Sequence, residues 1–270
     1  MEKHKTIMFE NRELHYRDEG RGNACTIVLL HGFLQTLNVW SSLTLSYMRT
    51  MRVITIDLPG HGYSATWSEV HTMDFMARAV KAVLDHAGVE RCVMAGHSMG
   101  GYVALAFAEQ YPYMLRGLAL LHSHAMPDDA DKRQYRDELC HQIHHNRAGF
   151  IVEFITNLFD ESKRQALAQD IKELRDNCLE NQEEGIIAAQ RGMKVRTSRI
   201  RTLQALNVPI LFFYGKNDPR LPYELGLSQA TVPHRSEVVL LDNVAHMCFM
   251  EDREYVRRRL ADFVAQCFSI

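Results

Sequence analysis

The stretch CVMAGHSMGG, residues 92–101, places Ser98 between two glycines, after a short apolar run and before a helical pattern that starts at Gly100. A Gly-x-Ser-x-Gly core on a turn from strand to helix exposes a serine hydroxyl for nucleophilic attack. Side chains at Gly96 and Gly100 would collide where the strand turns into the helix. The same turn points the backbone N–H of Met99 toward the place where an oxyanion would form. We therefore predict a serine nucleophile at residue 98.

The composition is that of a globular chain with enough apolar residues for a full core. Of the 270 residues, 46% are apolar and 24% are charged, and the formal net charge is -2. A chain of this length forms one large domain, or one domain with an insertion. Because the net charge is small, it gives no general attraction to nucleic acid or to anionic membranes, and we expect neither as a partner.

The start of the chain and its cysteines favour a cytoplasmic location. Residues 1–20 alternate charged and apolar residues and lack the apolar core of a secretory signal. No run approaches the roughly 18 apolar residues that a membrane-spanning helix needs. The six cysteines are scattered without a Cys-x-x-Cys pair, in a chain long enough to fold without disulfides. We expect reduced and mostly buried thiols.

Predicted strands and helices alternate over residues 1–123 and again over residues 197–270. This alternation favours a mostly parallel central sheet with helices on both faces. An opening hairpin is expected to cover a sheet edge, with its strands at 6–9 and 13–16 and a turn out at 18–22. Continuous apolar runs, typical of strands buried on both faces, follow at 26–30, 51–58, 92–95, 115–121, 209–214 and 237–241. Helical spacing of apolar residues predicts helices at 73–84, from Gly100, from about Tyr223, and from about Cys248 to Phe268.

The alternation stops between residues 124 and 196. Three helical patterns follow one another there without a strand: a narrow apolar stripe that includes Tyr135 and Leu139, a wide stripe over 150–159, and a third from Leu167. Helices of this kind sit on the rim of the sheet. We predict a helical cap, residues 124–196, inserted into a core formed by residues 1–123 and 197–270. Substrate specificity would then depend on how the cap encloses the pocket.

A serine nucleophile needs a base that takes its proton and an acid that orients the base. Asp218 lies on a turn just beyond one predicted strand, and His246 lies just past the last one. The C-terminal ends of parallel strands meet at one edge of the sheet, and the order Ser98, Asp218, His246 is the order that this motif requires. We predict that these three residues form a triad. Asp242 is a rival acid, but it precedes His246 by only four residues and is expected to shape that loop.

An oxyanion hole needs a second backbone N–H besides that of Met99. The loop that follows the run 26–30 is suited to supply it, because Gly32 lets the backbone turn toward the site. We predict that the amide of Phe33 is the second donor, and each such donor contributes about 3 kcal/mol of transition-state stabilisation. His31, in the same loop, is expected to bond the loop backbone.

Other histidines need an interpretation as well. For His122 and His124, at the entry to the predicted cap, two interpretations stay open: polar loop residues or residues that reach the pocket. His141, His144 and His145 have the i, i+3, i+4 spacing that metal ligands use on a helix. No matching carboxylate or cysteine motif accompanies them, so we interpret them as a solvated helix face.

Five motifs together carry a family resemblance over nearly the whole chain. They are LLHGF (29–33), DLPGHGYS (57–64), GHSMGG (96–101), YGKNDP (214–219) and NVAHMCFMED (243–252). In these motifs the chain resembles α/β-hydrolases of the lid-bearing esterase, lactonase and epoxide-hydrolase-like group. The resemblance implies the α/β-hydrolase fold, with Ser98 as nucleophile, Asp218 as acid, His246 as base, and the amides of Phe33 and Met99 as oxyanion donors.

The chain departs from the family pattern at three places. The family commonly has a glycine before the base histidine and Glu-x-Pro after it, where this chain has Ala245 and 251–253 (EDR). Haloalkane dehalogenases and epoxide hydrolases of this group carry an aspartate nucleophile, so Ser98 favours acyl transfer. The lyase of menaquinone biosynthesis is similar around the serine but usually has an arginine after the glycine pair, where this chain has Tyr102.

These observations predict a serine hydrolase that cleaves a small carboxylic ester, lactone or thioester through an acyl-enzyme, with no metal or organic cofactor. Two alternatives stay open. One is a menaquinone-biosynthesis-type lyase that uses the same triad for proton abstraction. The other is a non-enzymatic receptor for a small molecule on the same fold. Turnover separates the receptor from both enzymes.

Overall fold

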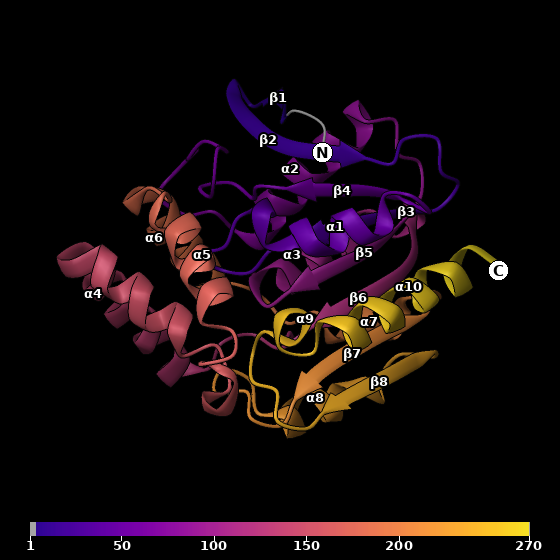
Figure 1. Cartoon of the computed structure of the whole chain (residues 1–270). Coiled ribbons are helices and arrows are strands. Elements are labelled where there is room, and N and C mark those ends of the chain that lie inside the picture. Colours follow the sequence, from indigo (N-terminus) through magenta and orange to yellow (C-terminus); the bar gives the residue numbers. More distant parts are fainter. Residues whose placement is uncertain (1–3, 270) are drawn as a thin grey trace.

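The structure of the protein is a computed structural model that describes residues 4–269. Its strands form one sheet of eight, in the order β1-β2-β4-β3-β5-β6-β7-β8 (Figure 1). The strands are β1 (Lys5–Phe9), β2 (Arg12–Glu19), β3 (Thr26–Leu30), β4 (Arg52–Ile56), β5 (Cys92–His97), β6 (Leu115–Leu121), β7 (Ile210–Gly215) and β8 (Ser236–Leu241). β2 is antiparallel to both of its neighbours, and the remaining neighbours pair in parallel. The predicted mostly parallel sheet is confirmed.

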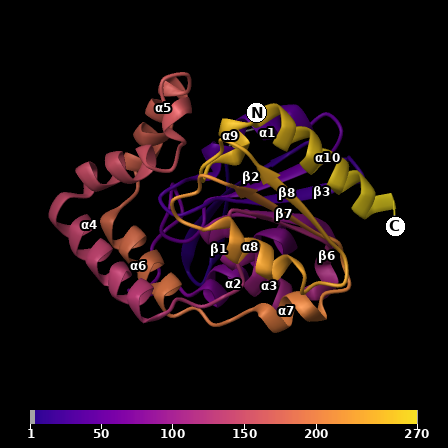
Figure 2. The same cartoon turned by 90° about the horizontal axis from the view of Figure 1, so that it is seen from below.

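The central strands are buried on both faces because helices cover both sides of the sheet. Every residue of β3 and β5 is buried, as expected for continuous apolar runs. Figure 2 shows α1 and α10 on one side of the strands and α2, α3, α7 and α8 on the other. Their bounds are α1 (Ser41–Tyr47), α2 (Met73–His86), α3 (Met99–Gln110), α7 (Ile200–Ala205), α8 (Tyr223–Ala230) and α10 (Arg253–Ser269). The fold is that of an α/β-hydrolase.

Three helices between β6 and β7 lie beside the sheet (Figures 1 and 2). They are α4 (Ala130–Thr156), α5 (Ala168–Leu179) and α6 (Glu183–Lys194), and α4 packs against both of the others. The first two predicted apolar stripes lie on either side of a kink at Asn146 in α4, and the second, over 150–159, continues past the end of that helix at Thr156. The sequence patterns did not predict α6. The division into a core and a cap at residues 124–196 stays a prediction, and residues 1–3 and 270 of the predicted core lie outside the described residues.

Several predicted boundaries differ from the structure by one or two residues, and two differences are larger. β2 runs to Glu19, through the start of the predicted turn, because the buried carboxylate of Asp18 pairs with Arg52 and Arg21 from within the strand. The predicted closing helix is broken at Asp252, whose backbone angles of φ -136° and ψ 57° are not helical, into α9 (Cys248–Glu251) and α10. The break turns Glu251 toward the loop that carries His246.

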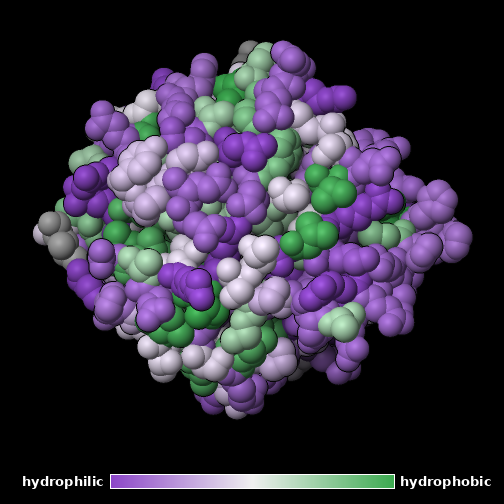
Figure 3. Space-filling view, turned by 180° about the vertical axis from the view of Figure 1, so that it is seen from behind, coloured by the Kyte–Doolittle hydropathy of each residue, from purple (hydrophilic) through white to green (hydrophobic). Residues whose placement is uncertain are grey.

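The surface and the cysteines are those of an ordinary globular chain. Seen from behind, hydrophilic side chains cover most of the surface, and hydrophobic ones occur in small groups (Figure 3). Within residues 4–269, no helix combines the length and the hydropathy that crossing a bilayer requires. All six cysteines are free, and four of them are buried, as predicted.

Candidate active site

Ser98 is the single residue between the end of β5 and the start of α3, at a sharp turn. Its backbone angles of φ 50° and ψ -113° lie in a region that side-chain-bearing residues rarely adopt, and strain of this kind concentrates at functional sites. The turn is tight enough that a Cβ on Gly96 would lie 2.3 Å from the carbonyl oxygen of Gly100. Glycine at these positions is therefore a steric requirement, as the motif predicts.

The turn is fastened to the neighbouring strand β6. The N–H of Ser98 donates to the carbonyl oxygen of Leu121 at 2.9 Å, and the hydroxyl of Ser123 donates to the carbonyl oxygen of Ser98 at 2.9 Å. A Cβ on Gly101 would lie 2.3 Å from the Ser123 hydroxyl oxygen. The missing side chain at Gly101 is what lets the start of α3 approach the end of β6.

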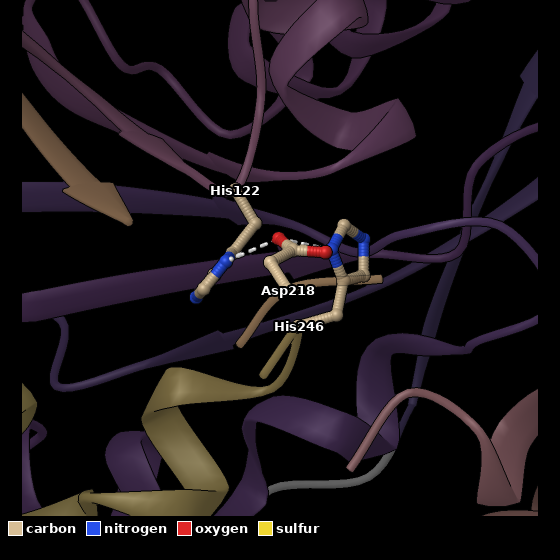
Figure 4. Close-up of side chains that lie close together, drawn as sticks. All are labelled: His122, Asp218 and His246. Carbon is tan, nitrogen blue, oxygen red and sulfur yellow. Dashed lines mark hydrogen bonds and ion pairs between the residues drawn. The ribbon is translucent and has the colours of Figure 1, made fainter. Parts of the chain in front are cut away.

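Asp218 and His246 come together although 28 positions separate them in the chain. Asp218 follows β7, and its Oδ2 accepts a hydrogen bond from the Nδ1–H of His246 at 2.8 Å (Figure 4). Its Oδ1 accepts from the backbone N–H groups of Arg220 and Leu221 at 2.8 and 3.1 Å. Because a carboxylate only accepts, the proton of His246 lies on Nδ1, which leaves Nε2 free to accept another proton.

His122 is a second histidine on the same carboxylate. It follows β6 with a φ of 50°, and its Nδ1–H donates to Asp218 Oδ2 at 2.8 Å, opposite His246 (Figure 4). Burial acts to lower the pKa of His122, but Cys248 and Asp218 beside it outweigh burial and raise that pKa above its ordinary value. Sequence reasoning left His122 between a loop and a pocket interpretation. Its place at the end of a predicted parallel strand is the signal that could have found it.

Burial and neighbouring charges both shift the pKa values of Asp218 and His246. Burial alone would raise the pKa of Asp218, but His246 and His122 hold it well below its usual range. Burial lowers the pKa of His246, and the positive charges of His122 and Arg220 act in the same direction, against the attraction of Asp218. His246 is therefore neutral at neutral pH, which is the form that accepts a proton.

The loop that carries His246 is held by Glu251, the first residue of the segment 251–253, which departs from the family's Glu-x-Pro at its last residue. The Glu251 carboxylate accepts from the backbone N–H groups of Ala245 and Met247 at 3.1 and 3.0 Å, and from that of Asp160 at 3.0 Å. The N–H of His246 itself donates to a backbone carbonyl at 2.9 Å. Glu251 thus joins the His246 loop to the segment that follows α4. Sequence reasoning noted Glu251 but gave it no role.

Ser98 and His246 line one cavity together with Phe33. Within residues 4–269, no hydrogen bond joins the Ser98 hydroxyl to His246, and contacts of this kind often tighten only when substrate binds. The loop of Phe33 is brought to the start of α3 by Gly100, where a Cβ would lie 2.3 Å from the carbonyl oxygen of Leu30. The two predicted amide donors, on Phe33 and Met99, thus belong to segments in close contact.

The remaining candidates have other partners. His31 donates from Nδ1 to the Gly32 carbonyl at 2.8 Å and accepts at Nε2 from the N–H of Leu58 at 2.9 Å, so it bonds loop backbone as predicted. The side chain of Asp242 is 74% exposed and pairs with Lys216 at 2.6 Å. In the rest of the predicted set, His124 accepts at Nδ1 from the Met126 N–H, and His144 lies exposed beside Glu183.

One group of side chains has the composition of a metal site. His122, Asp218 and His246 offer ligand atoms that lie within 4.8 Å of one another. Both imidazoles point their Nδ1–H groups at the same carboxylate oxygen at hydrogen-bond length. A metal bound between them would have to displace both protons, because a metal ligand must be deprotonated.

The chain belongs to the alpha/beta hydrolase family, whose family model matches residues 26–138. The solved structure of a thermophilic esterase from Thermogutta terrifontis, with malate bound, is 30% identical, covers 98% of this chain and 99% of its own, and has a TM-score of 0.92. A 2-hydroxy-6-oxononadienedioate/2-hydroxy-6-oxononatrienedioate hydrolase of Paraburkholderia phymatum is 29% identical over 94% of this chain and 91% of its own length.

A third relative is named as a transferase component, not as a hydrolase. The dihydrolipoyllysine-residue acetyltransferase component of an acetoin cleaving system in Pseudomonas putida is 30% identical over 94% of this chain and 67% of its own length. The esterase and the oxononadienedioate hydrolase are hydrolases, and this chain is similar to both over nearly its whole length. The family membership that the motifs suggested is thus confirmed.

Proposed function

We propose that this protein is a serine hydrolase that cleaves a small carboxylic ester, lactone or thioester through an acyl-enzyme formed on Ser98. One observation supports this above the others: the hydrogen bond from His246 to Asp218, beside the cavity that Ser98 lines. It orients a neutral imidazole whose second nitrogen is free to take a proton. We extend the proposal to α4–α6, which act as a cap over this cavity.

The reaction follows from these groups. His246 Nε2 takes the proton of the Ser98 hydroxyl as the oxygen attacks the carbonyl carbon. The N–H groups of Phe33 and Met99 hold the resulting oxyanion, and His246 returns the proton to the leaving alcohol or thiol as its bond to the carbonyl carbon breaks. Water then attacks the acyl-enzyme with His246 as base, which releases the carboxylic acid and restores Ser98. Asp218 stays ionised and stabilises the imidazolium that forms in each half of the reaction.

The names of the relatives agree with hydrolysis in preference to the lyase and receptor alternatives. An esterase and a hydrolase of an oxo-dioate are among the proteins most similar to this chain. Tyr102, at the place where the menaquinone-pathway lyase usually has arginine, instead stacks under the guanidinium of Arg196, with the two groups 4.2 Å apart. Tyr102 lines the cavity, so no arginine side chain enters from that position.

The test is the hydrolysis of p-nitrophenyl acetate and p-nitrophenyl butyrate by the parent protein and by Ser98→Ala. We expect turnover by the parent, and loss of nearly all of it in Ser98→Ala with an unchanged melting temperature. Arg258→Gln, an exposed change on α10, is the matched control and keeps parental activity. Full activity in Ser98→Ala would refute the nucleophile assignment. Absence of turnover in the parent over a panel of esters, lactones and thioesters would leave the lyase and receptor alternatives.

A further inference from the structure

The cavity above Ser98 is lined by positive charge and by no negative charge. Lys132, Arg136 and Arg220 line it, and no aspartate or glutamate of the described residues does. Lys132 and Arg136 project from one face of α4, since they are four positions apart, and Arg220 comes from the loop after β7. Cations so placed on two sides of one cavity attract an anion between them.

Nearby carboxylates do not neutralise this charge. Asp128 is buried and pairs with both Arg136 and Arg196, the second at 2.6 Å, so one carboxylate serves two guanidinium groups. Both pairs hold the pKa of Asp128 below its usual value, against the effect of burial. Two guanidinium groups thus share one carboxylate, and within residues 4–269 neither Lys132 nor Arg220 forms an ion pair with a carboxylate.

The guanidinium of Arg220 is held in place without a carboxylate partner. It lies 4.1 Å over the ring of Phe154, and its Nη1 donates to the hydroxyl of Tyr135 at 2.9 Å. Its Nε is buried and has no hydrogen-bond partner within residues 4–269. A buried donor without an acceptor is costly, and an arginine whose Nε edge is free matches the two oxygens of a carboxylate.

We propose that the cavity above Ser98 binds the carboxylate of an acidic substrate, with Arg220 and Lys132 as its receiving side chains. This inference rests on the proposed hydrolase function and names its substrate class: esters that carry a second, ionised acid group. Arg220 follows Asp218 by two residues and lines the same cavity as Ser98 and His246. A carboxylate held by Arg220 is therefore placed within one small molecule's reach of the reacting serine.

Two pairs of isosteric esters test the proposal. One pair has the acid on the acyl side, monoethyl glutarate against ethyl 4-carbamoylbutanoate. The other has it on the leaving group, 4-carboxyphenyl acetate against 4-carbamoylphenyl acetate. We expect kcat/KM to favour the anion over its neutral amide by about tenfold or more in at least one pair. Raising the salt concentration reduces that preference.

Substitutions locate the preference. Arg220→Gln lowers the anion-to-amide ratio by about tenfold and Lys132→Gln lowers it by a smaller factor, while Arg220→Lys keeps part of it. Arg258→Gln removes one positive charge from the exposed face of α10 and leaves the ratio unchanged. Because each ratio compares two esters on the same protein, a general loss of activity cancels. Equal kcat/KM within both pairs, or a parental ratio in Arg220→Gln, overturns the proposal.

A binding measurement separates this proposal from the hydrolase function. Titration calorimetry of glutarate into the parent protein needs no turnover, and glutaramide is its neutral control. We expect glutarate to bind at least tenfold more tightly than glutaramide, and Arg220→Gln to remove that difference. If glutarate binds in this way but no ester is cleaved, the hydrolase function fails and the anion site stands. If esters are cleaved and glutarate binds no better than glutaramide, the anion site fails alone.

Discussion

The cluster around Asp218 at the strand ends and the cations that line the cavity differ in how far their polar groups have partners. At the strand ends, Asp218 accepts four hydrogen bonds, two from histidine side chains and two from backbone N–H groups. Among the cations that line the cavity, Arg220, from the loop after β7, has a buried Nε without an acceptor within residues 4–269, and Arg136 of α4 shares one carboxylate with Arg196. The hydrogen bonds of the Asp218 carboxylate are all made within the protein, whereas the cations that line the cavity have too few carboxylate partners.

This difference suggests that one region transfers protons and the other selects the substrate. Groups that must move a proton need fixed orientation, which a saturated hydrogen-bond network on rigid strand ends provides. Groups that choose a substrate need unsatisfied capacity that the substrate completes. We therefore expect changes to the side chains of Asp218 and His246 to reduce the rate for every substrate, and changes to the cations and the α4 side chains that line the cavity to change the order of substrate preference.

The largest expected effect is at Asp218, the proposed acid. Asp218→Asn keeps the shape of the side chain but removes the charge that orients His246, and a loss of about 10⁴ in kcat follows by analogy with serine proteases. Asp242→Asn, which breaks only an exposed pair with Lys216, should change kcat by less than about threefold. Steady-state kinetics on one neutral ester compare the two. The assignment fails if Asp242→Asn proves the more damaging change.

The next effect is at the loop that carries the base. Glu251→Ala leaves the buried N–H groups of Ala245 and Met247 without acceptors, which should lower the free energy of unfolding by about 2–4 kcal/mol. The loop then orients His246 less well, so kcat should fall on anionic and neutral esters alike. Urea unfolding and kinetics measure both, with the exposed Asp262→Ala on α10 as control. Parental stability and kcat in Glu251→Ala would show that Glu251 does not hold this loop.

A smaller effect is expected on the cap side. Phe154 packs edge-on against Phe33, with ring centroids 5.7 Å apart, and lies under Arg220. Phe154→Ser should change relative kcat/KM between short and long acyl esters about fivefold or more, or lower the melting temperature. The apparent pKa of the acid limb should stay within about 0.3 of the parent's. A large shift of that pKa would contradict the division between the two regions.

The smallest effect is on pH dependence. His246 must be neutral to accept the serine proton, so kcat/KM falls as the pH drops through its pKa. Because burial lowers that pKa, the acid limb should lie below the free histidine value of about 6.5. His122→Gln removes a positive charge beside Asp218 and should move the limb to higher pH. Profiles with and without EDTA should coincide, and loss of activity with EDTA would point to a metal at the His122, Asp218 and His246 cluster.

The sequence predicted the strands of the sheet better than the helices α4–α6 for a physical reason. Parallel strands buried on both faces read as continuous apolar runs, and 26–30 and 115–121 match β3 and β6 residue for residue. The α6 helix, by contrast, has alanines and glycines on its buried face, and Gly185 meets the backbone of Gly60. Only two large apolar side chains of α6, Ile186 and Met193, are buried, so no run of large apolar residues predicted that helix.

Some features of the site were predictable from the sequence and others were not. The motif around Ser98 and the strand-end positions of Asp218 and His246 were visible in the sequence, and their roles stay predictions. The bond from His122 to Asp218 joins residues 96 positions apart, and local patterns carry no information on such a pairing. The positive charge around the cavity was not predicted for a related reason. Lys132 and Arg136 have the pattern of a solvated helix face, and the sequence does not show that Arg220 lies across the cavity from them.

The central claim is that Ser98 becomes acylated, and mass spectrometry tests it most directly. The parent protein is mixed with excess p-nitrophenyl butyrate, quenched in acid within milliseconds to seconds, and digested for peptide mapping. We predict a burst of p-nitrophenol and a butyryl group on the peptide that contains Ser98, absent from Ser98→Ala. Turnover by the parent without any acylated peptide, or with the acyl group on another residue, would contradict this account.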